Sequence, residues 1–154
     1  MRALIIDDEP MPAKHLREMI KQHCFEISEI ELELSPIVAL KLVEENSYDI
    51  IFLDVEMPEM DGLTFLKKVQ LPSSTSVIFT TAYSEYALDA FKANATHYIM
   101  KPVEKEELVM AVRKTTYQSQ SREKASAKNN LTIFDGDEYL IVDMQDIISL
   151  EADG

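Results

Sequence analysis

The sequence predicts an α/β fold in which five parallel strands form a doubly wound sheet, with a short β extension at the C-terminal end. Short apolar runs alternate along the chain with segments whose apolar residues recur every three or four positions. This alternation is typical of parallel strands joined by helical crossovers that cover both faces of a sheet. Hydrophobic residues make up 46% of the 154 residues, which is enough to build the core of such a domain.

Each expected strand is a short run of apolar and β-branched residues. The runs cover residues 3–6, 30–34, 50–53, 77–80 and 98–100. The first and third are apolar nearly throughout, which is typical of central strands buried on both faces. The second alternates apolar and acidic residues, so we expect it at an edge of the sheet. A flavodoxin-like sheet of order 2-1-3-4-5 satisfies these expectations.

Helical patterns fill the intervals between the expected strands. Ala13, Leu16 and Ile20 lie on one side of the first helix, residues 85–95 form the fourth, and the last begins near Val103. Residues that favour helix starts precede these patterns. They are Pro10, Pro12, Pro36, Asp61 and Ser84.

The character of the chain changes near residue 118. We expect a first domain over residues 1–118, a polar linker over 119–130, and the start of a second domain over 131–154. Apolar runs in this last segment predict strands at 131–134, 139–142 and 147–150.

Composition excludes several classes of function. A formal net charge of −13 argues against nucleic-acid binding by these residues. Only three glycines are present, which excludes a Walker A loop and a dinucleotide-binding turn. The single cysteine, Cys24, cannot form an intrachain disulfide, and no apolar stretch approaches the ~20 residues that span a bilayer. We therefore expect a cytoplasmic protein that does not enter the membrane.

Chemically active side chains follow four of the five expected strands. In a doubly wound sheet, ligands bind beyond the carboxyl ends of the strands, where the strand order reverses. A single aspartate at such a position is usually a helix cap, but here several groups are expected to meet at one edge. These groups are Asp7 and Asp8 after the first strand, Asp54 after the third, Thr80 and Thr81 after the fourth, and Lys101 after the fifth.

Three carboxylates at one sheet edge predict a site for a divalent cation. Two like charges about 4 Å apart repel by roughly 4 kcal/mol at an effective dielectric constant near 20. Mg²⁺ suits carboxylate ligands and takes its remaining ligands from water and phosphate. Three carboxylates also balance the charges of Mg²⁺ and Lys101. Such a site suits phosphoryl transfer, with a carboxylate as the nucleophile.

Four segments in order resemble the receiver domain of two-component response regulators: LIIDDEP, DIIFLDVEMPEMDG, IFTTAY and HYIMKP. The resemblance covers about residues 1–118. It implies that Asp54 accepts a phosphoryl group from a sensor histidine kinase. It further implies that Asp8 binds Mg²⁺ directly, Asp7 binds it largely through water, and the backbone carbonyl of Glu56 supplies a further ligand beside Asp54.

The same resemblance implies a conformational switch. Thr81 would be the switch hydroxyl and Lys101 the ammonium group of the site, followed by a cis peptide bond to Pro102. Tyr98 would be the switch aromatic, which turns inward when Thr81 moves toward the phosphoryl group. The surface of helix 4, strand 5 and helix 5 would then change and form a phosphorylation-dependent homodimer.

A second resemblance concerns the C-terminal half of the chain. The segments TAYSEYALDAFKANATHYIMKP and IISLEADG are similar to receivers fused to LytTR-type DNA-binding domains. This implies a regulator of transcription. Residues 131–154 contain seven acids and no Lys or Arg, so DNA binding is expected only from a further C-terminal part.

Two alternatives remain at this stage. One is an aspartate-nucleophile phosphohydrolase, which also uses Mg²⁺ and a strand-end aspartate. Such enzymes usually have an Asp two residues after the nucleophile, where this chain has Glu56. They also carry a cap domain, for which this chain has no room. A stand-alone adaptor without an output domain is the other, and the strands after residue 130 count against it. We therefore expect a signalling switch and not an enzyme.

Overall fold

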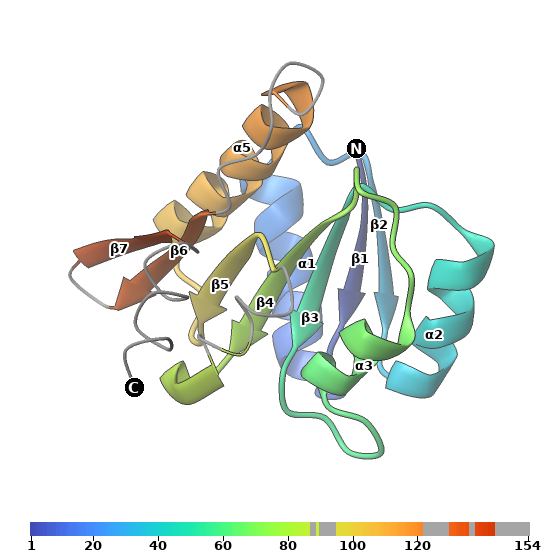
Figure 1. The fold of residues 1–154 in the computed structure, drawn as a ribbon. Coiled ribbons are helices and arrows are strands. Elements are labelled where there is room, and N and C mark those ends of the chain that lie inside the picture. The colour runs from blue at the N-terminus through green and yellow to red at the C-terminus, as the bar shows by residue number, and fades with distance from the viewer. Residues whose placement is uncertain (87–88, 90–94, 122–129, 136–137, 144–154) are drawn as a thin grey trace.

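The computed structural model describes residues 1–86, 89, 95–121, 130–135 and 138–143. Its strands form one sheet of order β2-β1-β3-β4-β5-β6-β7 (Figure 1). The first five are parallel, which confirms the expected doubly wound order 2-1-3-4-5. They are β1 (Arg2–Ile6), β2 (Glu29–Glu33), β3 (Ile50–Asp54), β4 (Ser76–Thr81) and β5 (His97–Met100).

Two further strands extend the sheet beyond β5. The strand β6 (Asn130–Asp135) runs parallel to β5, and β7 (Glu138–Asp143) pairs antiparallel with β6. They match the strands expected at 131–134 and 139–142, whereas the expected strand at 147–150 lies outside the described residues. The C-terminal hairpin therefore continues the sheet at its β5 edge.

Helices cover both faces of the sheet (Figure 1). The helices α1 (Pro10–His23) and α5 (Lys105–Ser121) lie on one face, and α2 (Pro36–Glu45) and α3 (Gly62–Lys68) lie on the other. Side chains of successive strand residues point to opposite faces, so two apolar clusters form. Ile5, Phe52 and Ile99 pack toward α1 and α5, whereas residues such as Ile6 and Leu53 pack toward α2 and α3.

The helix starts follow local capping chemistry. Ser35 Oγ accepts a hydrogen bond from the Val38 amide (3.3 Å) at the start of α2, and Asp61 Oδ1 accepts one from the Thr64 amide (2.7 Å) at the start of α3. The last helix begins at Lys105, two residues later than expected. The helix expected over residues 85–95 falls mostly on residues that are not described, apart from the short 3₁₀ turn η1 (Ser84–Tyr86).

Burial of the strands agrees with the pattern that predicted them. All five residues of β3 are buried, and so are the last four of β1. The acidic alternation of β2 places it at the edge, where its residues are exposed or half-buried. Within the described ranges, no helix is both long and apolar enough to cross a bilayer.

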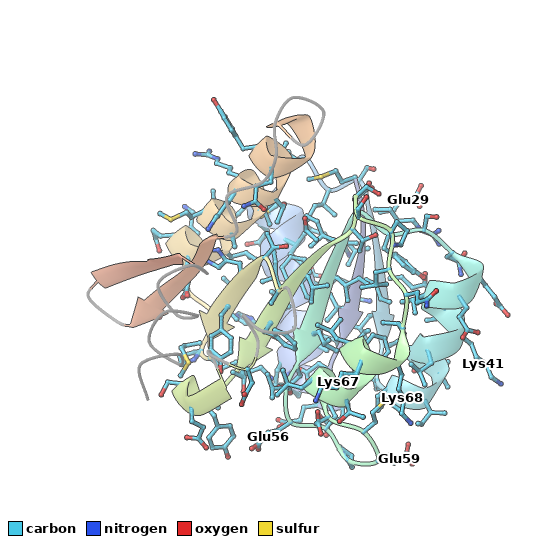
Figure 2. The ribbon with its side chains drawn as sticks, in the orientation of Figure 1. Glu29, Lys41, Glu56, Glu59, Lys67 and Lys68 are labelled. Carbon is cyan, nitrogen blue, oxygen red and sulfur yellow. The ribbon has the colours of Figure 1, made fainter. Side chains whose placement is uncertain are left out.

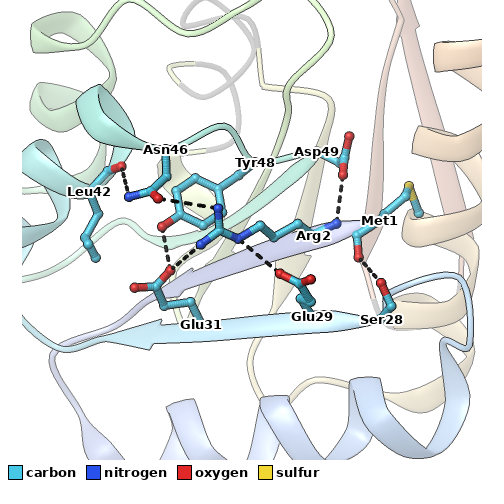
Figure 3. A network of polar contacts seen from close by, with 9 residues as sticks. All are labelled: Met1, Arg2, Ser28, Glu29, Glu31, Leu42, Asn46, Tyr48 and Asp49. Carbon is cyan, nitrogen blue, oxygen red and sulfur yellow. Dashed lines mark hydrogen bonds and ion pairs between the residues drawn. The ribbon is translucent and has the colours of Figure 1, made fainter.

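A polar network holds the amino ends of the strands (Figure 3). The Arg2 guanidinium lies 4.8 Å from the centre of the Tyr48 ring and 3.3 Å from Glu31 Oε2. The Tyr48 hydroxyl donates to the same Glu31 oxygen at 2.6 Å, and the Arg2 amide donates to Asp49 at 2.7 Å. These contacts join β1 to β2 and to the segment before β3.

We predict that Tyr48→Phe lowers the free energy of unfolding by about 1 kcal/mol, because the ring remains packed while the bond to Glu31 is lost. Burial, together with the bond to Glu31, raises the pKa of Tyr48 to about 12, whereas the unfolded chain ionises near pH 10. The stability that Tyr48 contributes is therefore present below about pH 10 and is lost as pH rises toward 12. Denaturant unfolding across this range should show a shallower pH dependence for the variant than for the wild type. Equal slopes would contradict the prediction.

Candidate functional site: an acidic cluster bridged by a lysine

Three carboxylates meet beyond the carboxyl ends of β1 and β3. Asp7 and Asp8 follow β1 directly, and Asp54 is the last residue of β3. One oxygen atom from each lies within 4.8 Å of the others. The structure therefore brings together the three acids that the sequence singled out. Figure 2 shows this end of the sheet, where the labelled Glu56 and Glu59 lie on the loop that follows β3.

Lys101 joins two of these carboxylates from the end of β5. Its Nζ lies 2.8 Å from Asp7 Oδ2 and 3.1 Å from Asp54 Oδ2. Its backbone amide donates to the Thr81 carbonyl at 2.7 Å, and the Lys101–Pro102 peptide is cis, as the sequence resemblance implies. The backbone of Lys101 is thus fixed to the end of β4, while its side chain contacts the carboxylates.

Burial and charge together set the protonation of the cluster. Burial raises the pKa of Asp54 to about 6, with the Asp7 carboxylate adding to the increase and the Lys101 ammonium opposing it. Burial lowers the pKa of Lys101, but its bonds to Asp7 and Asp54 outweigh burial and leave the pKa above the ordinary value. At neutral pH the site therefore holds an ammonium group between carboxylates, with Asp54 mostly ionised.

The donor set fits a divalent cation. Three carboxylates face a single ammonium group, so the cluster carries excess negative charge when all three are ionised. In the part of the chain that the structure describes, Asp8 Oδ1 is buried and has no hydrogen-bond partner. A buried carboxylate oxygen without a partner is costly, and a metal ion would satisfy it. An acidic cluster of this kind is typical of the Mg²⁺ site of receiver domains.

Glu56 lies beside the cluster through its backbone. Its amide donates to Asp54 Oδ1 at 3.3 Å, while its side chain is exposed. The corresponding bond at β1 is made by the Glu9 amide to Asp7 Oδ1, at 2.9 Å. Asp7 and Asp54 therefore each use one carboxylate oxygen to order the loop that follows them and the other to contact Lys101.

The two residues expected to form a switch lie on the strands beyond Asp54, Thr81 on β4 next to β3 and Tyr98 on β5. Thr81, the last residue of β4, is buried, and its hydroxyl oxygen accepts a hydrogen bond from the Tyr83 amide at 3.3 Å. Tyr98 on β5 is fully buried, and its hydroxyl donates to the Tyr83 carbonyl. The aromatic ring is thus already turned inward in this structure, and Tyr83 connects it to Thr81.

Gly62 was not recognised as a site residue from the sequence. It is the first residue of α3, and its amide donates to the Val55 carbonyl at 2.8 Å. A Cβ at this position would overlap the carbonyl oxygen of Asp54 and lie 3.1 Å from the Phe79 side chain. The signal available in the sequence was that one of only three glycines follows the helix cap Asp61.

A doubly wound sheet with three carboxylates at its strand ends, two of them bridged by a lysine, defines the class of receiver-like signalling domains. Residues 3–113 match the family described as "Response regulator receiver domain". The chain belongs to this family, and it is a non-enzymatic signalling domain of two-component response regulators with an acidic pocket made by Asp7, Asp8 and Asp54.

Relatives in two staphylococci carry the name LytR. The chain is 36% identical to the "Transcriptional regulatory protein LytR" of Staphylococcus aureus over 97% of its own length and 61% of the relative. It is 37% identical to the "Sensory transduction protein LytR" of Staphylococcus epidermidis over 74% of its length and 45% of the relative. The chain spans about half to three fifths of the length of these relatives.

Solved structures agree on the fold. The response regulatory domain of mrkE from Klebsiella pneumoniae superposes with a TM-score of 0.69 at 28% identity, over 79% of this chain and 99% of that one. A receiver domain of a Francisella response regulator gives 0.67 at 26% identity, over 77% and 98% of the two chains.

We predict that Asp54→Asn stabilises the metal-free domain by about 1 kcal/mol at neutral pH, on the order of 5 °C in unfolding temperature. The substitution removes a buried charge that the site disfavours and keeps the size of the side chain. The difference should shrink as pH falls from about 6, the pKa of Asp54 in the folded domain, to about 4, its value in the unfolded chain, because protonation then removes the charge from the folded wild type as well. Thermal unfolding in a chelating buffer measures this. A variant less stable than the wild type at pH 7 would contradict the argument.

Gly62→Ala should lower the free energy of unfolding by about 1–3 kcal/mol, because the added methyl group forces the backbone of Asp54 or the start of α3 to shift. Lys67→Ala is the matched control, since Lys67 lies on the same helix and is exposed (Figure 2). Denaturant unfolding measures the free energy of unfolding of both variants against the wild type. An equal loss in Gly62→Ala and Lys67→Ala would show that the close contact at Gly62 is unimportant.

Proposed function

We propose that Asp54 accepts a phosphoryl group from a sensor histidine kinase in a Mg²⁺-dependent reaction. The single observation that carries this proposal is the convergence of Asp7, Asp8 and Asp54, two of which, Asp7 and Asp54, contact the ammonium group of Lys101. A carboxylate oxygen of Asp54 attacks phosphorus, the bond from phosphorus to the donor nitrogen breaks, and an acyl phosphate forms. Because the pKa of Asp54 is about 6, this nucleophile is mostly ionised at neutral pH.

The surrounding groups have distinct roles in this proposal. Asp8, Asp7, Asp54 and the backbone carbonyl of Glu56 would hold Mg²⁺, which supplies positive charge to the transferring phosphoryl group. Lys101 leaves its bond with Asp54 for a phosphoryl oxygen and keeps its bond with Asp7. The Thr81 hydroxyl donates to another phosphoryl oxygen. Tyr98, which bonds to the Tyr83 carbonyl, stabilises the position that Thr81 then takes.

The proposal extends to the parent protein. We infer that residues 1–118 form the receiver, 119–130 a linker, and 131–154 the start of a LytTR-like DNA-binding domain that acts in the cytoplasm. The name of the Staphylococcus aureus relative, a transcriptional regulatory protein that aligns over 97% of this chain, supports a role in transcription. DNA would be bound by residues further along the parent protein. The surface expected for a phosphorylation-dependent homodimer is made by helix 4, strand 5 and helix 5. Because β6 occupies the outer edge of β5, such a homodimer would form through α5 and the residues between β4 and β5, beside that edge.

Incubation with acetyl phosphate and Mg²⁺ should add one phosphoryl group per chain, detected by intact-mass analysis. Asp54→Asn should remove the label completely, and a chelator should suppress it in the wild type, because Mg²⁺ neutralises the charge at the site. Asp8→Asn should reduce labelling strongly, while Asp61→Asn, at an exposed helix cap outside the cluster, is the matched control and should label like the wild type. Labelling that persists in Asp54→Asn would overturn the assignment of the acceptor.

A further inference from the structure

The outer edge of β5 is occupied by β6 of the same chain (Figure 1). Two residue pairs are in register, His97 with Thr132 and Tyr98 with Ile133. Without β6, β5 would end the sheet with unpaired backbone groups, which are a template for adding a strand. The edge of β5 is therefore a docking surface, and its occupant here is the C-terminal hairpin.

The backbone of Tyr98 faces this docking surface. The Lys101 amide donates to the Thr81 carbonyl, so the backbone groups of Lys101 point toward β4. Backbone groups alternate between the two edges of a strand. Those of Met100 and Tyr98 consequently point away from β4, to the edge where β6 lies. The contact with the hairpin thus depends on where the backbone of Tyr98 lies.

The side chain of the same residue is connected to the acidic site. Its hydroxyl donates to the Tyr83 carbonyl, and the Tyr83 amide donates to the Thr81 hydroxyl oxygen. Thr81 is the neighbour of Thr80, which lies in register with Asp54. A continuous series of contacts therefore runs from Asp54 through Tyr98 to β6.

We propose that docking of β6 on the β5 edge and phosphorylation of Asp54 favour the same conformation, with Tyr98 turned inward, so that each strengthens the other. This inference rests on the proposed function of Asp54. The structure shows the docked hairpin together with the inward ring of Tyr98. Two events that stabilise one conformation are coupled, and their binding free energies change reciprocally.

The hairpin of β6 and β7 can dock on β5 or leave it as one unit. Six residue pairs join β6 to β7, whereas only two join β6 to β5. The short contact with β5 is the weaker of the two, so a change at Tyr98 alters docking and leaves the hairpin intact. The β5 edge is thereby the surface through which the receiver acts on the segment that follows it.

The test uses the full chain and adds beryllofluoride together with Mg²⁺. Beryllofluoride forms a phosphate-like adduct with an aspartate. Adduct formation should slow hydrogen exchange at the Tyr98 amide by about fivefold or more, the usual range of such couplings. Thr132→Pro, which removes a backbone donor from β6, should speed that exchange and weaken beryllofluoride binding by a similar factor. Thr132→Val keeps the donor and the branched side chain, so it should behave like the wild type. Unchanged exchange at Ile51 and Phe52 in β3 verifies that the variants are folded.

The outcomes separate the two proposals. If the wild type does not bind beryllofluoride, or if Asp54→Asn binds it equally well, the proposed function fails and this inference fails with it. If the wild type binds through Asp54 but Thr132→Pro binds with the same affinity, only the inference is overturned. Faster exchange of the Tyr98 amide upon adduct formation would also overturn it, since docking and phosphorylation would then oppose each other.

Discussion

The double contact of the Lys101 ammonium group with Asp7 and Asp54 is the interaction on which the site depends. At 2.8 and 3.1 Å it offsets the repulsion of acids that the sheet forces together at its edge. Its effect is incomplete, because burial and Asp7 still raise the pKa of Asp54 to about 6. The site is therefore organised but short of positive charge, which suits a place that a cation and a phosphoryl group enter.

The residues around Asp54 fix the position of this aspartate through several contacts. The Glu56 amide bonds to one carboxylate oxygen of Asp54, Lys101 bonds to the other, and Gly62 lies against its carbonyl. The loop after β3 and Lys101 thus hold the carboxylate, while the start of α3 packs against the backbone of Asp54. In the proposed phosphoryl transfer, a carboxylate held in this way would lose little orientational freedom when it reacts.

Tyr98 links the acidic site to the C-terminal hairpin because its side chain and its backbone contact different parts of the structure. Its side chain points into the apolar cluster beneath α2 and α3 and bonds to the Tyr83 carbonyl, while its backbone faces β6. A strand residue combines these roles naturally, since side chains lie perpendicular to the sheet and backbone bonds lie within it. On our proposal, a local change at the strand ends would be transmitted in this way within the plane of the sheet.

The sequence by itself determined the order of the first five strands and the three acids with their lysine, because both follow from local patterns. Apolar runs identify buried strands, and the rule that parallel strands end at one edge places Asp7, Asp8, Asp54 and Lys101 together. Only the tertiary structure decided the close contact at Gly62, the inward position of Tyr98, and the pairing of β6 with β5. Each of these depends on contacts between segments that are distant in the chain. A local sequence pattern does not indicate which backbone atom will lie against a glycine, or which free strand edge a later strand will pair with.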